Sequence, residues 1–373
     1  MADLFLHGAL RHLPLLEIVL GRRVDDAELT PAVLCGHVVR QPPGQPVPLL
    51  QADAVGRVPG LLLRGVCAAG LQRLQYYQVS CGHDPRPVPV QLDNGDTVTA
   101  QVFFSAPGAG SGAAPWSLQG WVADWAAISE QAAREVMAWY GRKSPDAIAA
   151  ALPGIQRRAA AHVSARTRAR DPHRDVAQEV IVHGHTHAYA RFFAMQEMDL
   201  QLRQYDGSIS PVLNRAAVLV GEAAVVLPYD PVRDTVLLIE QFRAPLFITG
   251  DRAPWVWEPV AGLLEPGETA QAAARREAAE EAGLILRHLE SAGEVYSSTG
   301  SSTEYLHLFI GLADLGGDFS AIGGTDEGED IRSRVLTFDQ LMQGVDARSY
   351  RDMPLVTTAL WLARHRDRLR LAG

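Results

Sequence analysis

The first third of the chain alternates short apolar runs with glycine and proline. Between residues 4 and 105 the apolar runs include LFLHGAL, GRVPGLLLRGV and VTAQVFF, and turn-forming segments such as QPPGQP and DNGDT separate them. Short apolar runs bounded by turn residues are typical of β-strands. We therefore predict a small β-rich domain over residues 1–125, with the Gly/Ala/Pro-rich segment 106–115 as a surface loop.

The next segment of the chain has a helical pattern. Two alanine-rich stretches, DWAAISEQAAREVMAWYGR and PDAIAAALPGIQRRAAAHV, place their apolar residues at helical spacing. The polar stretch SARTRARDPHRD follows, and it predicts a linker near residues 164–175. We assign residues 126–175 to a helical connector and linker, and residues 176–373 to a second domain.

The second domain returns to strand-like patterns and includes one strong helix. The stretches AAVVLPYDPVRDTVLLIEQF and YLHLFIGL read as strands, and a helical segment lies between them. No segment repeats at a fixed period, which argues against solenoids and propellers. The expected fold class is α+β, in two domains.

Composition and charge restrict the kind of partner. A single core rarely grows past roughly 250 to 300 residues, so 373 residues favour two domains. The net charge of −9 gives no general attraction to nucleic acid or to anionic lipid, and a small-molecule ligand is expected instead. Charged residues interrupt the first twenty positions, and no stretch reaches membrane length. The three cysteines form no CxxC pair, which fits a reducing cytoplasm.

The segment 262–284, GLLEPGETAQAAARREAAEEAGL, carries the candidate chemistry. Thr269 is placed to cap a helix and Gly283 to end it. Glu277, Glu280 and Glu281 stand at i, i+3 and i+4, which would place three carboxylates on one face within reach of a common point. A hard divalent cation such as Mg²⁺ would offset their repulsion. The alternative is a solvated acidic face balanced by Arg275 and Arg276.

The whole segment resembles the box motif of the Nudix hydrolases. The match includes Gly262, Glu268, the pair Arg276-Glu277, the pair Glu280-Glu281, and Gly283. The resemblance implies a mixed sheet between helices. It also implies metal binding by Glu277, Glu280, Glu281 and the carbonyl of Ala261, with catalytic roles for Glu280 and Glu281. Mg²⁺ is the expected ion and Mn²⁺ the alternative.

Segments outside the box resemble the bacterial ADP-ribose pyrophosphatase branch of that family. These are AAVVLPYDPVRDTVLLIEQFR, WEPVAGLLEPGE, TDEGEDIR and TTALWLARH. The resemblance implies a homodimer that hydrolyses ADP-ribose to AMP and ribose 5-phosphate, with the small N-terminal sheet of the catalytic domain exchanged between subunits. It assigns substrate contacts to Arg243, Glu258 and Glu304, an adenine sandwich to Phe192 and Arg215, and the role of general base to Glu327, with Glu329 as the alternative.

One departure from the branch leaves the substrate open. The branch usually has Ser-Pro-Gly after the box, whereas this chain has Ser298-Thr299-Gly300. A sugar nucleotide or another nucleoside diphosphate derivative therefore stays an alternative to ADP-ribose. An alternative of another class is a non-catalytic protein that binds ADP-ribose and regulates a partner.

The first domain resembles the γ-glutamylcyclotransferase-like fold, in LFLHGALRH, GRVPGLLLRGV and LQRLQYYQ. That fold implies a small anion pocket and a glutamate that acts as general acid and base. Gln78 stands at the glutamate position and His7 where tyrosine is common, and an amide cannot move the proton. We expect a domain without cyclotransferase activity. The combination of the two modules resembles proteins associated with tellurite resistance, a phenotype that these residues do not explain.

Three histidines alternate in VHGHTHAY, at positions 183, 185 and 187. On a strand they would share one face, which raises the hypothesis of a metal site. No carboxylate or cysteine stands at a fitting spacing beside them. An exposed strand face is the favoured interpretation.

Overall fold

The structure is a computed structural model that describes residues 2–105, 114–319 and 330–372. The chain divides into two compact units, Met1–Val220 and Gly221–Gly373. Each unit has its own sheets, helices and apolar cores, so each is described by itself.

The N-terminal unit begins with a six-stranded sheet in the order β3-β1-β5-β4-β2-β6. The strand β2 also pairs with β3, so the pairings β3-β1-β5-β4-β2-β3 close into a ring. Strand β1 pairs with β5 in parallel and with β3 antiparallel. The strands are β1 (Ala2–Leu6), β2 (Leu29–Gln41), β3 (Leu49–Val66), β4 (His83–Leu92), β5 (Thr97–Ser105) and β6 (Ala114–Pro115).

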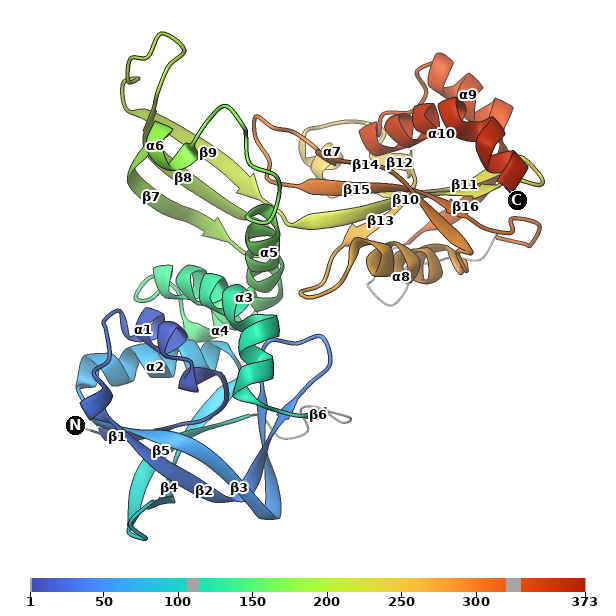
Figure 1. Cartoon of the computed structure of the whole chain (residues 1–373). Coiled ribbons are helices and arrows are strands. Elements are labelled where there is room, and N and C mark those ends of the chain that lie inside the picture. Colours follow the sequence, from blue (N-terminus) through green and yellow to red (C-terminus); the bar gives the residue numbers. More distant parts are fainter. Residues whose placement is uncertain (1, 106–113, 320–329, 373) are drawn as a thin grey trace. The chain divides into compact units, whose positions relative to one another are not determined.

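Helices form the second part of the N-terminal unit, and those between residues 13 and 138 pack against this sheet (Figure 1). Their apolar faces meet the sheet in a core that includes Leu15, Leu63 and Trp121. Short 3-10 turns lie at Gly8–Arg11 and Asp26–Glu28. The helices are α1 (Leu13–Leu20), α2 (Ala68–Ser80), α3 (Leu118–Ala138), α4 (Pro145–Ala149), α5 (Leu152–Ala165) and α6 (Val176–Glu179).

A buried ion pair ties α3 and α5 to a separate three-stranded sheet, β7 (Val180–Ala190), β8 (Ala194–Leu202) and β9 (Leu213–Leu219). Arg158 on α5 contacts Glu135 on α3 at 2.6 Å and donates to the carbonyl of Phe192 in the β7–β8 turn. Gly154 on α5 lets this turn approach, because a Cβ there would lie 2.9 Å from the Phe192 carbonyl oxygen. These contacts connect β7–β9 to the helices of the N-terminal unit, and the division into compact units falls at Val220. The predicted domain bounds, with a linker near residues 164–175, stay predictions.

The C-terminal unit is built on a seven-stranded mixed sheet. Its main path is β12-β11-β10-β15-β14, with β13 paired to β10 and β16 paired to β11. Strands β10 and β15 are parallel, and the other pairings are antiparallel. The strands are β10 (Glu222–Asp230), β11 (Thr235–Phe242), β12 (Trp255–Glu258), β13 (Val260–Leu263), β14 (His288–Tyr296), β15 (Tyr305–Leu312) and β16 (Arg332–Thr337).

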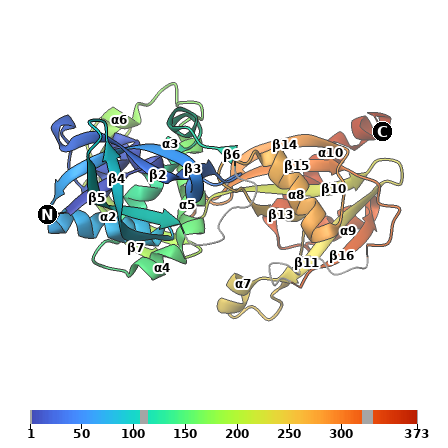
Figure 2. The ribbon, with the colours of Figure 1, turned by 90° about the horizontal axis from the view of Figure 1, so that it is seen from below.

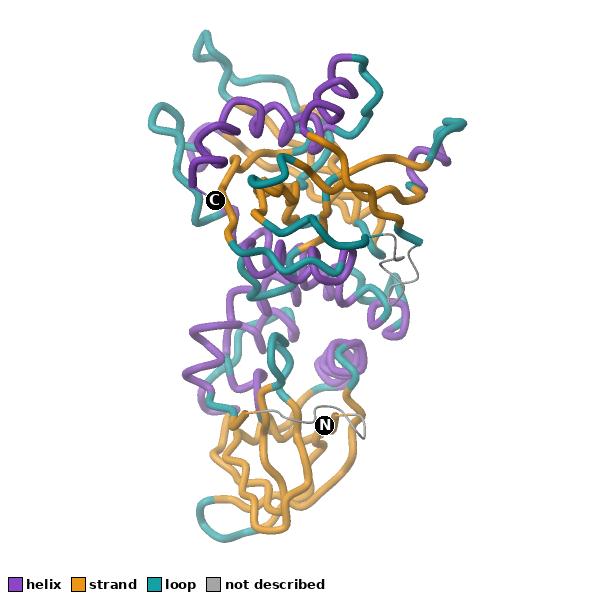
Figure 3. The backbone as a smooth tube through the Cα atoms, turned by 90° about the vertical axis from the view of Figure 1, so that its right-hand side faces the viewer, coloured by secondary structure: helices purple, strands orange, loops and turns teal. Residues whose placement is uncertain are grey.

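Helices cover both faces of this sheet (Figures 2 and 3). Leu237 and Ile239 of β11 pack with α8 (Ala270–Ala282), whereas Val236 and Leu238 pack with α9 (Phe338–Asp346) and α10 (Met353–Ala372). The alternation follows from the two-residue period of a strand. The short helix α7 (Ala244–Ile248) lies between β11 and β12.

The predicted α+β class and the mixed sheet between helices are confirmed. Across the described ranges, no helix has the length and apolar character that a membrane crossing requires. The γ-glutamylcyclotransferase-like assignment of the first domain stays a prediction.

Candidate active site

The helix α8 forms where the local sequence signals predict it. The Thr269 side chain accepts a hydrogen bond from the Ala272 amide at 3.2 Å and caps the first turn. Gly283 ends the helix in the left-handed region, with φ 62°. Ala273, Ala274 and Ala278 are buried and let the helix approach the sheet closely. The cap and the stop therefore fix which turns of α8 present the glutamates to β13.

Two of the box glutamates lie against the backbone of β13. The buried Glu281 accepts a hydrogen bond from the amide of Ala261 at 3.1 Å. Glu277 approaches Gly262 so closely that a Cβ at position 262 would lie 1.9 Å from its Oε1 atom. Only glycine leaves space for this carboxylate. The two carboxylates thus meet the same short stretch of strand, Ala261–Gly262.

Arg276 balances part of the negative charge around α8. Its Nε and Nη2 atoms donate to the two oxygens of Glu268 at 3.0 and 2.9 Å. Its Nη1 atom donates to Glu277 at 2.6 Å and to Glu280 at 3.1 Å. Burial alone would raise the pKa of Glu268, but the hydrogen bonds from Arg276 and from the Glu265 amide hold that pKa below its usual range. Arg276 therefore reduces the repulsion between the box carboxylates, which the sequence predicts to lie close together.

The three box carboxylates do not converge on one point. The Glu280 side chain is 55% exposed beside Arg276, whereas Glu281 is buried on the sheet side of the helix. Among the residues that the structure describes, no three histidine, cysteine, aspartate or glutamate side chains form a group able to hold a metal ion. Arg276 Nη1 bonds both Glu277 and Glu280, whereas Glu281 bonds the Ala261 amide. Joint binding of a metal by all three carboxylates stays a prediction.

The pair Glu277 and Glu281 nevertheless fits a hard divalent cation. Both are carboxylates on consecutive turns, and both face the backbone of β13 at Ala261 and Gly262. Mg²⁺ usually takes one or two protein carboxylates and completes its shell with waters and substrate phosphate oxygens. Two carboxylates beside Gly262 are a donor set that such an ion can use.

Arg243 and Glu258 form a second charged pair on the α8 side of the sheet. The register pairs Ile239 with Glu258, and Ile239 packs against the α8 core. Arg243 donates from Nε to both oxygens of Glu258, at 3.0 and 2.9 Å, and Nη2 adds a further bond. The two residues that the sequence predicts as substrate contacts therefore lie together, with the guanidinium held in one orientation.

Asp352, which sequence analysis missed, adds another carboxyl beside this pair. It accepts a hydrogen bond from the Leu355 amide at 2.8 Å at the start of α10. Burial is the main cause that raises its pKa to about 6, and the negative charges of Glu258 and Glu304 raise it further against the opposing effect of Arg243. The aspartate two residues before Pro354 is a helix-start signal. Nothing in the sequence places it beside Arg243, because that proximity is tertiary.

The predicted adenine contacts lie apart within the β7–β9 sheet. Phe192 is exposed at the β7–β8 turn and packs edge-on against Phe193. At the end of β8 next to this turn, Ala194 pairs with Leu219 of β9. Arg215 pairs with Met198, further along β8 and away from the turn. One chain alone does not form the predicted sandwich. The base candidates Glu327 and Glu329 lie outside the described residues.

The three alternating histidines contact glutamines. His183 bonds to Gln201 at 2.7 Å and His185 bonds to Gln196 at 2.8 Å. Burial is the main cause that lowers the pKa of His187 to about 4. These contacts favour the predicted strand face, and in the described part of the chain no metal-holding group includes them.

The N-terminal unit brings its own predicted pocket residues together. His7, Gly8, Gln78 and His83 line one small pocket. His7 contacts the Phe103 carbonyl at 2.7 Å, and burial lowers its pKa to about 4. Burial also lowers the pKa of His83. Both imidazoles are therefore neutral at pH 7, and the pocket holds no carboxylate among its described lining residues.

Comparison with known proteins agrees with the geometry of the C-terminal unit. The NUDIX domain model matches residues 220–354. The chain is 36% identical over 182 residues to the ADP-ribose pyrophosphatase of Escherichia coli strain K12. The aligned segment covers 49% of this chain and 87% of that protein.

Two further relatives differ from each other in the substrate that their names give. The ADP-ribose pyrophosphatase of Haemophilus influenzae is 33% identical over 168 residues, 44% of this chain and 77% of that protein. The GDP-mannose pyrophosphatase of Klebsiella pneumoniae is 33% identical over 162 residues, 43% of this chain and 80% of that protein.

Proposed function

Because the chain belongs to the Nudix family of hydrolases, we propose that it hydrolyses the diphosphate bond of ADP-ribose with the help of Mg²⁺. Water adds to one phosphorus, the bond to the bridging oxygen breaks, and AMP and ribose 5-phosphate leave. The observation that carries the proposal is the approach of Glu277 and Glu281 to the Ala261–Gly262 backbone. Gly262 leaves room there for the Glu277 carboxylate, which a side chain at position 262 would displace.

The side chains divide the work as follows. Glu277 and Glu281 would hold the cation, which when bound polarises the diphosphate and favours ionisation of water. Arg243 would donate to diphosphate oxygens, and Glu258 fixes the plane of its guanidinium through the Nε and Nη2 bonds. Arg276 pairs with both Glu268 and Glu277 and would orient the Glu277 carboxylate toward β13. Glu280, at the exposed rim, would contribute to the charge of the cation site.

Five further residues enter the proposal by resemblance. Glu327 would act as the general base that receives the proton of water, with Glu329 as the alternative. Phe192 and Arg215 would hold the adenine, in a homodimer that exchanges the β7–β9 sheet. Glu304 would contact the substrate close to Asp352, whose pKa its charge raises.

A sugar nucleotide is the second candidate substrate. A relative named GDP-mannose pyrophosphatase matches at 33% identity, and the Ser298-Thr299-Gly300 segment departs from the ADP-ribose branch. The cation site does not discriminate between these substrates, because it would contact only the diphosphate that they share. Discrimination has to come from the groups that hold the base and the sugar.

The test is a substrate panel of ADP-ribose and GDP-mannose, with product chromatography in the presence and absence of Mg²⁺. We expect ADP-ribose to give the higher kcat/KM, and removal of Mg²⁺ to abolish turnover. Faster hydrolysis of GDP-mannose would make the second candidate the function. Binding of ADP-ribose without turnover would instead indicate a regulatory protein.

The variant Glu281→Gln tests the cation site. It should lower kcat by orders of magnitude, because the amide removes a charge that the cation needs while it keeps the side-chain volume. Asp367→Asn removes a charge from the exposed face of α10 and is the matched control with unchanged kcat. Near-normal turnover in the glutamine variant would remove the metal assignment.

A further inference from the structure

The carboxyl of Asp352 lies at the start of α10 and uses only one of its oxygens inside the protein. That oxygen accepts a hydrogen bond from the Leu355 amide at 2.8 Å and caps the helix. The other oxygen accepts no hydrogen bond from any residue that the structure describes, and it is not sealed from solvent. One side of the carboxyl is therefore open to a proton or to a ligand.

Hydrogen bonds hold this end of α10 against the segment between β11 and β12. Arg351, the residue before Asp352, donates to the carbonyl of Ala253. The next carbonyl along that segment, of Pro254, accepts the amide of Arg243 at 2.8 Å. Asp352 and Arg243 are thus anchored through neighbouring residues of one short segment. This anchoring places the carboxyl beside the arginine that would contact the diphosphate.

The charged side chains that act on Asp352 come from three elements. They are Arg243 at the end of β11, Glu258 on β12 and Glu304 just before β15. Glu258 balances the charge of Arg243, because it accepts from the Nε and Nη2 atoms. Glu304 then leaves these three groups with a net negative charge. Burial, followed by the charges of Glu258 and Glu304, raises the pKa of Asp352 to about 6 against the opposing effect of Arg243.

A diphosphate at Arg243 would bring further negative charge to the same place. Repulsion between like charges in a partly buried site disfavours the ionised form of a carboxyl. A protonated carboxyl carries no charge, and its O–H can donate a hydrogen bond to a phosphate oxygen. A bound diphosphate would therefore favour the protonated form of Asp352.

We propose that Asp352 is a further substrate-binding residue, which takes up one proton from solvent on its open oxygen when the diphosphate binds at Arg243. The new O–H bond then points to a phosphate oxygen, and one negative charge leaves the site. The inference rests on the proposed function, because it places the diphosphate at Arg243. Affinity is then highest below pH 6 and falls as the pH rises through 6.

The experiment is calorimetric titration of the full chain with ADP-ribose in EDTA, in two buffers of different ionisation enthalpy. The disubstituted diphosphate of ADP-ribose does not titrate between pH 5 and 8, so a buffer-dependent heat reports protons taken up by the protein. We expect an uptake of about half a proton near pH 6.5 and a Kd about tenfold higher at pH 8 than at pH 5. Both correspond to a rise of about one pKa unit in the complex.

Asp352→Asn separates this proton from other titrating groups. The amide is neutral at every pH and still caps the helix. The Kd of this variant should not change between pH 5 and 8, so at pH 8 it should bind about tenfold more tightly than the wild type. Asp339→Asn, at an exposed aspartate in the first turn of α9, is the matched control with the wild-type pH dependence. If Asp352→Asn does not fold, Asp352→Ser decides, since serine also caps a helix and does not titrate.

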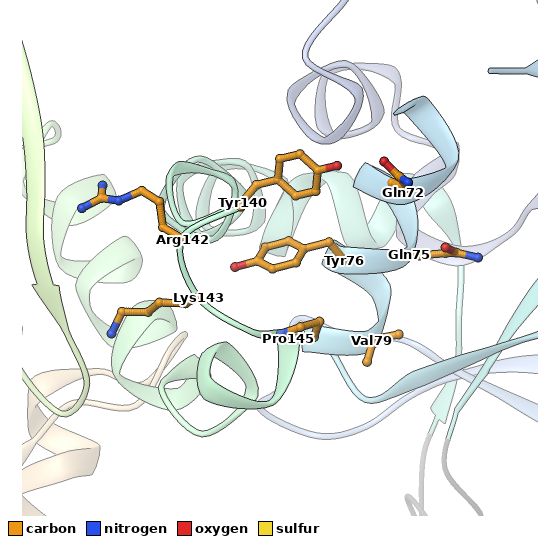
Figure 4. A pocket seen from close by; sticks show the side chains of 9 residues that line it. Gln72, Gln75, Tyr76, Val79, Tyr140, Arg142, Lys143 and Pro145 are labelled. Carbon is orange, nitrogen blue, oxygen red and sulfur yellow. The ribbon is translucent and has the colours of Figure 1, made fainter. Parts of the chain in front are cut away.

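A ligand also finds space in the open pocket between α2 and the turn that joins α3 to α4 (Figure 4). The described residues that line this pocket include no aspartate, glutamate or histidine. Binding there would take up no proton near pH 6. Proton uptake therefore distinguishes binding beside Asp352 from binding in the N-terminal unit.

Each outcome of the titration decides the inference. Binding with equal affinity at pH 5 and 8 would overturn it and leave the proposed hydrolysis in place. An Asp352→Asn variant that binds more weakly than the wild type at pH 8 would also overturn it. GDP-mannose, another disubstituted diphosphate, is the second probe. If neither probe binds, the inference fails, and the turnover assay with Mg²⁺ still decides the proposed function.

Discussion

Gly262 is the residue on which the proposed cation site depends most directly. A Cβ at this position would lie 1.9 Å from Glu277 Oε1 and 2.0 Å from its carboxyl carbon. Gly262→Ala must therefore displace the Glu277 carboxylate by an ångström or more. We expect kcat to fall about 100-fold, the size of effect that a misplacement of this order produces. Steady-state kinetics with saturating Mg²⁺ would measure it.

The control for this variant is Gly317→Ala. A Cβ there meets the Phe319 ring at 3.5 Å, which is ordinary contact, and the backbone is outside the left-handed region. This control should keep the wild-type kcat. If Gly262→Ala also kept it, Glu277 would not be a ligand of the cation.

Asp352 gives the C-terminal unit a pH-dependent stability. Burial, with smaller effects from Glu258 and Glu304, raises its pKa from the ordinary 3.8 to about 6. Between pH 4 and 6 the folded unit keeps a proton that the unfolded chain has lost. The contribution of Asp352 to the free energy of unfolding is therefore fully present below pH 4 and is lost as the pH rises through 6. This decrease in the free energy of unfolding is at most about 3 kcal/mol.

Asp352→Asn tests this sign, because the amide does not titrate and its oxygen can still accept from the Leu355 amide. Urea unfolding from pH 4 to pH 7 gives the free energy of unfolding of the wild type and of the variant. The wild-type value minus the variant value should decrease as the pH rises. An increase in this difference with rising pH would contradict the raised pKa of Asp352.

At the scale of elements, the cap of α8 links stability to activity. Thr269→Ala removes the hydrogen bond from the Ala272 amide and should cost about 1 kcal/mol. Since the first turn sets the position of the following turns against β13, kcat should also decrease severalfold. Thr337→Ala removes the equivalent cap of α9, where the threonine accepts from the Gln340 amide. Thermal melting should show a similar decrease in melting temperature for both variants, whereas only Thr269→Ala should lower kcat. An equal decrease in kcat for both variants would show that the α8 cap has no specific effect on the site.

The sequence predicted elements whose signals are local. The limits of α8 follow from Thr269 and Gly283, which act within one helical turn of themselves. The sequence also identified Arg243 and Glu258, although it did not show that they pair. The position of Asp352 could not be predicted in this way. It depends on side chains brought together from distant elements, and a local pattern contains no record of that packing.

The contacts of the β7–β9 sheet with the helices also could not be predicted from local sequence patterns. A polar stretch before residue 176 suggested a domain boundary, because charged segments without apolar residues are typical of linkers. The structure instead holds the β7–β8 turn through Arg158, which binds Glu135 and the Phe192 carbonyl. The composition of a segment contains no information on such a tertiary contact.

At the scale of the whole molecule, the two compact units should unfold in separate steps, and Arg158 should affect only one of them. Arg158→Ala leaves Glu135 buried without its partner and frees the β7–β8 turn, a change that typically costs about 3 to 5 kcal/mol. Calorimetry of the full chain should show one transition moving to lower temperature. The other transition should stay in place, because the sheet and helices of the C-terminal unit have their own cores. Mg²⁺ with AMP should raise only that second transition, which identifies it.

Arg134→Ala provides the matched control, since it removes an arginine from α3 whose side chain is 58% exposed and 3.6 Å from Glu130. An exposed pair of this kind contributes little, so both transitions should stay within about 0.5 kcal/mol of the wild type. If Arg158→Ala instead lowered both transitions equally, the two units would share one cooperative core. The β7–β9 sheet would then stabilise the catalytic unit directly.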